Sequence, residues 1–63
     1  MIFDVNKYNY RVSTPEGHGK VVWTEYLVKE NLNRVYVELD VNKSVKCFDE
    51  TSVEITVKES RCR

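Results

Sequence analysis

Two segments of strict alternation constrain this chain more than any other feature of its sequence. Apolar side chains occupy every second position in both, at 35, 37 and 39 and again at 53, 55 and 57. Because successive side chains of a strand point to opposite faces, each segment predicts a strand with one apolar face. The residues expected to face a common core are Val35, Val37, Leu39, Val53, Ile55 and Val57.

Turn-forming residues separate these two strands from further strand-like segments. The strongest loop signal is the run Thr14-Pro15-Glu16-Gly17-His18-Gly19, because proline presets φ and glycine reaches positive φ. Asparagines in 29–33 and 41–43 predict hairpin connections, and the polar segment 49–52 is short enough for one 3-10 turn. With short strands near 10–13 and 44–48, these signals predict five strands and no helix.

The segment 20–28 has the composition of a strand but no single apolar face. Both parities are largely apolar, positions 22, 24, 26 and 28 as well as positions 21, 23, 25 and 27. We therefore expect a long, bent strand that changes face, as bulges and barrel corners require, and either parity can face inward. Phe48 and one of Trp23 or Tyr26 are expected in the core.

The expected strands favour a barrel over a flat sheet. A flat five-stranded sheet of this length would expose one apolar face and two unpaired edges, whereas curling buries the face and hides most of the edges. The predicted fold class is all-β, a five-stranded and partly open barrel. It forms a single domain over residues 1–63, with a core from about 10 to 58 and a polar tail at 59–63.

The pattern resembles small bacterial SH3-like barrel modules of the KOW, Tudor-like and CarD types, in which a G-x-G-x-V loop opens the second strand. The motifs that carry the resemblance are Val12-x-Thr14-Pro15-x-Gly17-x-Gly19-x-Val21-Val22, Val35-x-Val37-x-Leu39-Asp40, Lys46-x-Phe48 and Glu50-x-x-Val53-Glu54. The similarity covers roughly residues 10–57. It implies an SH3-like barrel and three alternative kinds of partner: RNA or ribosomal surfaces, RNA polymerase, or peptide segments.

Length and charge limit the classes of function. A chain of 63 residues leaves little volume for a reaction cleft, so we do not expect an enzyme. Ten basic residues balance ten acidic ones, and the excess of positive charge typical of phosphate-backbone binding is absent. The longest apolar run, 21–23, cannot form a transmembrane helix or a signal-peptide core. We expect a cytoplasmic protein that does not bind a membrane.

No motif for catalysis, metal binding or cofactor binding is recognisable. His18, Cys47 and Cys62 lack the spacing of a metal site. Gly17-x-Gly19 lacks the third glycine and the following helix of a dinucleotide-binding loop. The two cysteines are too few for a disulfide framework and predict free thiols in a reducing compartment. We expect no catalytic residue, no metal and no cofactor.

The aromatic residues suggest a binding surface instead. Tyr36 is expected to be exposed on the polar face of its strand, where it could anchor a partner or stack a base, with Tyr8 or Tyr10 nearby. Cross-strand pairing within the sheet is the structural alternative. The candidate binding residues are Tyr8, Tyr10, His18, Lys20, Arg34 and Tyr36.

The expected function is that of a non-catalytic binding module, a protein-interaction or accessory domain that docks on another protein through an exposed aromatic face or an edge strand. The alternative is a weak KOW-like nucleic-acid-binding domain. That domain would use the tyrosines together with Arg11, Lys20, Arg34 and Lys46.

Overall fold

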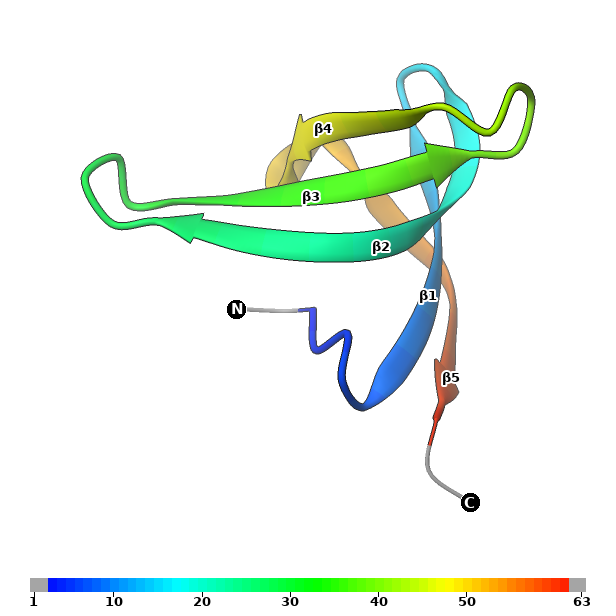
Figure 1. Cartoon of the computed structure of the whole chain (residues 1–63), viewed down its shortest axis with the longest axis horizontal. Helices are drawn as coiled ribbons and strands as arrows, with labels where there is room; N and C mark the ends of the chain where they lie inside the picture. The colour runs from blue at the N-terminus through cyan, green and yellow to red at the C-terminus, as the bar shows by residue number, and fades with distance from the viewer. Residues whose placement is uncertain (1–2, 62–63) are drawn as a thin grey trace.

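A computed structural model describes residues 3–61, which form one curled sheet of five antiparallel strands (Figure 1). The elements are β1 (Tyr8–Thr14), β2 (Gly17–Leu27), β3 (Leu32–Leu39), β4 (Val45–Asp49), the 3-10 turn η1 (Glu50–Ser52) and β5 (Glu54–Ser60). The strand order is β4-β3-β2-β1-β5, so β4 and β5 are the two edges. The all-β class and the single 3-10 turn are as predicted, and the partly open sheet is compatible with a small SH3-like barrel.

The core lies on one face of the curled sheet. It consists of Phe3, Tyr10, Val12, Val21, Val35, Val37 and Leu39, with Val5, Tyr8, Phe48 and Val53 partly buried against it. The prediction for β3 is confirmed, because Val35 and Val37 are 0% exposed and Leu39 is 2% exposed. The alternation of apolar residues in this strand therefore predicts its buried face correctly.

The segment before β1 completes the core, which begins earlier than residue 10. Phe3 is buried and packs its ring edge against Tyr10, with 5.0 Å between the ring centroids and 77° between the planes. The backbone N–H of Asp4 donates to the Tyr10 hydroxyl at 2.8 Å. The N–H groups of Lys7 and Tyr8 donate to the Asp4 carbonyl, forming a turn that leads into β1.

β2 changes face at a bulge, as its doubled apolar pattern predicts. Val21 pairs with Val37 and Trp23 with Tyr36, while Val22 has no partner. Trp23 consequently faces away from the core. The prediction that Trp23 or Tyr26 joins the core is wrong: Trp23 is 58% exposed and Tyr26 is 49% exposed. Phe3 and Tyr10 supply the aromatic rings of the core instead.

The predicted core face of β5 is also wrong for two of its three residues. Ile55 pairs with Val12 and Val57 with Arg11, and Thr56 between them has no opposing residue in the register of β1, although its hydroxyl donates to the Arg11 carbonyl. This extra residue puts Ile55 and Val57 on opposite faces of the sheet. Because β5 is also an edge strand, both stay partly exposed, Ile55 at 36% and Val57 at 43%. Only the flanking valine at position 53 packs against the core.

The loop predicted at 14–19 is shorter than expected. Only Pro15 and Glu16 separate β1 from β2, and the Thr14 hydroxyl closes this turn by donating to the Gly17 carbonyl at 2.7 Å. Gly17 has a φ of 122°. Gly19 lies inside β2, where an added Cβ would collide with a carbonyl oxygen of β3. Close strand packing, not a turn, therefore requires glycine at position 19.

The other two hairpins follow the asparagine signals in part. Asn31, with a φ of 51°, takes the left-handed conformation between β2 and β3, as predicted. Between β3 and β4 this conformation belongs to Lys43, with a φ of 61°. Asn42 supports that turn through its side chain, whose Oδ1 accepts from the Ser44 N–H at 3.0 Å.

The end of the chain is more structured than a polar tail. β5 continues to Ser60 and pairs there with Tyr8, and the Arg61 N–H donates to the Lys7 carbonyl at 2.8 Å. The prediction for Cys62 lies outside the described residues. Within residues 3–61, no helix is long and apolar enough to cross a bilayer.

Candidate binding surface

Trp23, Tyr36 and Cys47 form a row across β2, β3 and β4. Trp23 lies opposite Tyr36, and Tyr36 lies opposite Cys47. The neighbours of Tyr36 at positions 35 and 37 are fully buried, and side chains alternate along a strand. The row therefore faces away from the core.

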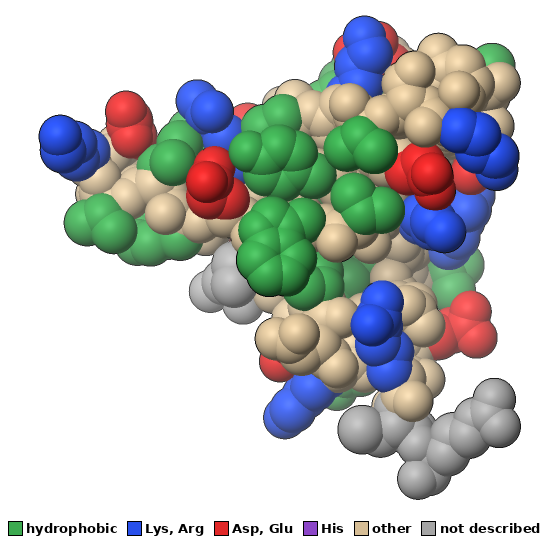
Figure 2. All heavy atoms as spheres, in the orientation of Figure 1, with side chains coloured by type: hydrophobic (Ala, Val, Ile, Leu, Met, Phe, Trp, Pro, Cys, Tyr) green, Lys and Arg blue, Asp and Glu red, His purple; other side chains and the backbone are tan. Residues whose placement is uncertain are grey.

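Two valines extend this row into an apolar surface. Val22 in the bulge is 40% exposed, and Val45 near the start of β4 is 55% exposed. We call Val22, Trp23, Tyr36, Val45 and Cys47 the outer patch. Figure 2 shows hydrophobic side chains gathered over β2, β3 and β4 in the middle of one face, with charged side chains around them.

Tyr36 is half-buried, although the sequence predicts an exposed residue. Its hydroxyl donates to Glu25 Oε1 at 3.2 Å. This hydrogen bond to a carboxylate, followed by the negative charge of Glu25, raises the pKa of Tyr36 above its ordinary value of 10.0. The hydroxyl is thus engaged within the sheet, and the ring is the part of Tyr36 that a partner would meet.

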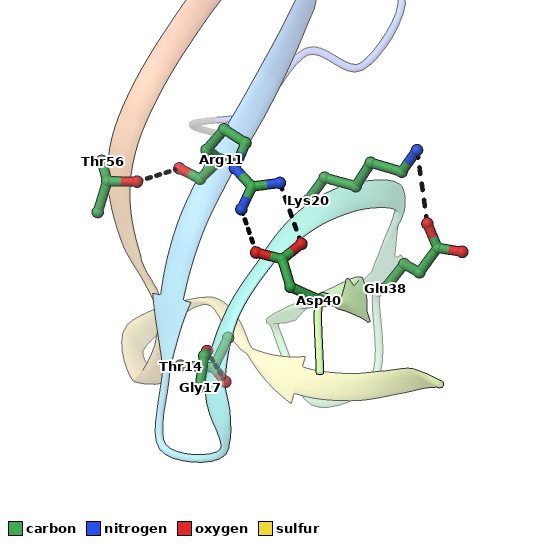
Figure 3. Close-up of polar contacts among 7 residues, drawn as sticks. All are labelled: Arg11, Thr14, Gly17, Lys20, Glu38, Asp40 and Thr56. Carbon is green, nitrogen blue, oxygen red and sulfur yellow. Dashed lines mark hydrogen bonds and ion pairs between the residues drawn. The ribbon is translucent and has the colours of Figure 1, made fainter. Parts of the chain in front are cut away.

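Three cations of the sheet are paired with carboxylates. Arg11 donates two hydrogen bonds to Asp40, and Lys20 Nζ lies 3.4 Å from Glu38 Oε1 (Figure 3). The Arg11 guanidinium lowers the pKa of Asp40, mainly through these hydrogen bonds. At the β4 edge, Lys46 Nζ lies 3.3 Å from a carboxylate oxygen of Glu16.

Two of the predicted binding residues lie on the core side of the sheet. Tyr10 is 2% exposed, so the prediction that it contacts a partner is wrong: β1 buries residues 10 and 12 on the same face. Tyr8 is half-buried against the core, and Lys58 Nζ lies 4.2 Å from its ring centroid. Neither tyrosine joins Tyr36 in a common surface.

The remaining predicted residues lie on the outer face. His18 is exposed in β2, opposite Ser13, although the sequence predicts a loop over residues 14–19. Lys20 lies three residues before Trp23, and Arg34 lies opposite Glu25 beyond it. The structure therefore brings Lys20, Arg34 and Tyr36 around Trp23, which the sequence did not single out as a binding residue.

A groove of about 370 Å³ lies beside the outer patch, between the segment before β1 and the middle of β2. Its lining residues are Phe3, Asp4, Val5, Asn6, Trp23 and Thr24. Asp4, one of these lining residues, has its carboxylate fixed over the following turn, because its Oδ1 accepts from the Asn6 N–H at 3.2 Å and from the Lys7 N–H at 3.3 Å. Trp23 belongs both to the outer patch and to this groove.

The described residues offer no cluster for metal chemistry. Among residues 3–61, no group of three or more His, Cys, Asp and Glu side chains could hold a metal ion. Cys47 is an exposed free thiol. No family model matches the chain, and neither the curated proteins nor the solved structures contain a significant match to it.

Proposed function

We propose that this domain is a non-catalytic interaction module that binds another protein through the outer patch. The observation that carries the proposal is the exposure of Trp23, 58% of which is open to solvent in the middle of a sheet face. Tryptophan and tyrosine are enriched among the residues that contribute most to protein–protein binding. Contiguous apolar surface on a small domain is typical of an interaction site.

The two sheet edges are less suited to a partner than the outer patch. Lys46 of β4 lies opposite Val37, and Lys58 of β5 lies opposite Tyr10, so each edge strand has a lysine on its core face. Inward-pointing charges on edge strands are a common means of preventing strand addition. We therefore favour side-chain contacts with the outer patch over extension of the sheet by a partner strand.

The size of the domain favours a modest interface. A standard interface removes about 800 Å² from each partner, which is roughly a sixth of the 4576 Å² exposed here. The outer patch occupies only the central part of three strands. It suits a short segment or a small surface of a partner, with the weak and reversible binding of small contacts.

The KOW-like nucleic-acid alternative has less support. Arg11, Lys20 and Lys46 each have a carboxylate within ion-pair distance. Binding a phosphate backbone depends on cations that can displace counterions. The exposed indole of Trp23 could still stack a base, so the experiment includes nucleic acid.

The test compares proteins captured from a lysate of the native host by the wild-type domain and by Trp23→Ala. Tyr26→Ala is the matched control, because Tyr26 is a similarly exposed aromatic residue whose hydroxyl donates to Asn31 in the β2–β3 hairpin. We expect specific proteins to be retained by the wild type and the control and lost by Trp23→Ala. Identical capture by all three proteins would contradict the proposal.

A second arm measures binding to generic RNA and DNA at two salt concentrations. Binding at low salt that collapses at higher salt, with no protein captured, would favour the nucleic-acid alternative. No binding at low salt would exclude it.

A further inference from the structure

We propose that the groove between the segment 3–6 and β2 receives an arginine side chain of the partner protein. This inference rests on the proposed function and adds the chemistry of the contact. The groove combines three elements that suit such a side chain: an apolar wall, the aromatic ring of Trp23 and the carboxylate of Asp4.

The apolar wall is formed by the first described residues of the chain. Val5 is half-buried and supplies the accessible part of this wall, whereas Phe3, which also lines the groove, is only 1% exposed. Their positions are held by the ring contact of Phe3 with Tyr10 and by the hydrogen bond from the Asp4 N–H to the Tyr10 hydroxyl. An arginine has a three-carbon stem that can be buried along such a surface while its charged end stays near water.

Trp23 supplies a ring for the charged end. Trp23 is 58% exposed and lines the groove. A guanidinium is attracted to the face of an indole and stacks on it, and tryptophan is the best of the aromatic residues for this contact. The domain already contains a contact of this kind, in which the ammonium of Lys58 lies over the ring of Tyr8.

Asp4 supplies the opposite charge at the same groove. Its Oδ1 is held by the N–H groups of Asn6 and Lys7, whereas no donor among the described residues reaches its Oδ2. The planar guanidinium can stack on an aromatic ring and donate to a carboxylate at the same time, which a lysine ammonium does less well. The negative charge of Asp4 would also repel a phosphate, so the groove favours a protein ligand over a nucleic acid.

The test uses three blocked pentapeptides that differ only at the central residue, which is arginine, lysine or citrulline. Citrulline has nearly the shape of arginine but no charge. Amide shifts of the ¹⁵N-labelled domain report binding, and we expect saturable shifts at residues 3–6 and 23–24. The arginine peptide should bind about tenfold more tightly than the citrulline peptide, the combined effect of one exposed ring contact and one exposed ion pair.

Asp4→Asn is the decisive variant, because asparagine keeps the Oδ1 that accepts from Asn6 and Lys7 but loses the charge. We expect it to abolish the preference for arginine over citrulline. The matched control is Glu30→Gln, which removes one charge from the hairpin beyond the end of β2 and should leave the preference unchanged.

Equal binding of the arginine and citrulline peptides overturns this inference. It is also overturned if an oligonucleotide shifts the amide signals of these residues and the peptides do not. If Trp23→Ala still loses its captured proteins in either case, the proposed function stands without the arginine contact. If capture is also independent of Trp23, both proposals fail.

Discussion

Trp23 of β2 lies directly opposite Tyr36 of β3, and this pairing exists because Val22 has no partner on β3. Regular alternation from the buried Val21 would place Trp23 in the core. The extra residue reverses the faces, so that Trp23 points outward and Thr24 points inward. One bulge thus converts a potential core residue into the centre of a surface.

The first prediction concerns the contribution of Trp23 to stability. Because its side chain is mostly exposed, Trp23→Ala should lower the free energy of unfolding by about 1 kcal/mol or less, the value of one cross-strand pair. Phe3→Ala should cost about 3–5 kcal/mol, as expected for a buried aromatic residue. Urea denaturation followed by circular dichroism measures both. A large loss for Trp23→Ala would mean that the ring serves the fold and not a partner.

The buried face of a strand could be predicted from the sequence where the pairing is regular, so that each residue lies opposite one residue of the neighbouring strand. β3 is the clear case, since Val35, Val37 and Leu39 are all buried as their alternation indicates. Turn chemistry was informative as well: the hairpin at Asn31 lies where its asparagines predict it. Local sequence is sufficient in these segments because each element has a single consistent period.

Prediction failed on the position of the bulges, although the doubled apolar pattern of residues 20–28 did predict one in β2. Nothing in the residue types marks Val22 or Thr56 as unpaired, because a bulge is set by the strand across from it. Of the candidate surface, the outward position of Tyr36 followed from alternation, but the exposure of Trp23 did not. The burial of Phe3 was missed because residues 3–7 lack a clear period and are held by contacts with Tyr10.

The second prediction separates the two glycines. Gly19→Ala should destabilise the domain by about 1–3 kcal/mol or more, the usual cost of overpacking, since the new Cβ would meet the Glu38 carbonyl oxygen and lie 2.7 Å from Val37 Cγ1. Gly17→Ala meets nothing within 4 Å but must keep a φ of 122°, so its cost is backbone strain of about 1–3 kcal/mol.

These two costs can be distinguished by a second substitution. Val37→Ala removes one of the two atoms that crowd position 19 but leaves the carbonyl. In a double-mutant cycle, Gly19→Ala should couple to Val37→Ala, whereas Gly17→Ala should not. Equal coupling of both glycines would contradict the close approach of β2 and β3 at Gly19.

The third prediction concerns acid. The Arg11 hydrogen bonds lower the pKa of Asp40 below its ordinary value of 3.8, and the charges of Lys43 and His18 act in the same direction. A carboxyl whose pKa falls on folding contributes stability above its unfolded pKa and loses that contribution as the pH drops through the folded pKa. The melting temperature of the wild type should therefore exceed that of Asp40→Asn at neutral pH, and the difference should vanish in acid.

The difference in melting temperature between the wild type and Asp40→Asn should be small and should decrease as salt is added. Both side chains are close to half exposed, 43% for Arg11 and 46% for Asp40, and exposed ion pairs are screened by solvent and salt. Glu30→Gln serves as the control, because it removes an exposed charge from the β2–β3 hairpin. A difference between wild type and Asp40→Asn that persists in strong acid would show that the ion pair is not its source.

The last prediction concerns alkali and tests the geometry of the outer patch. The hydrogen bond to Glu25 favours the neutral phenol and raises the pKa of Tyr36 above 10.0. Its contribution to stability is therefore complete below pH 10.0 and is lost as the pH rises through the folded pKa. Glu25→Gln should return the pKa of Tyr36 toward 10.0, as followed by the ¹³C shift of the Tyr36 ring during titration.

Above pH 10.0, Tyr36→Phe should lose stability less steeply than the wild type, because it has no phenol to ionise in the unfolded chain. An unchanged titration of Tyr36 in Glu25→Gln would mean that its hydroxyl is free to bind a partner, and that the outer patch presents a polar group as well as a ring.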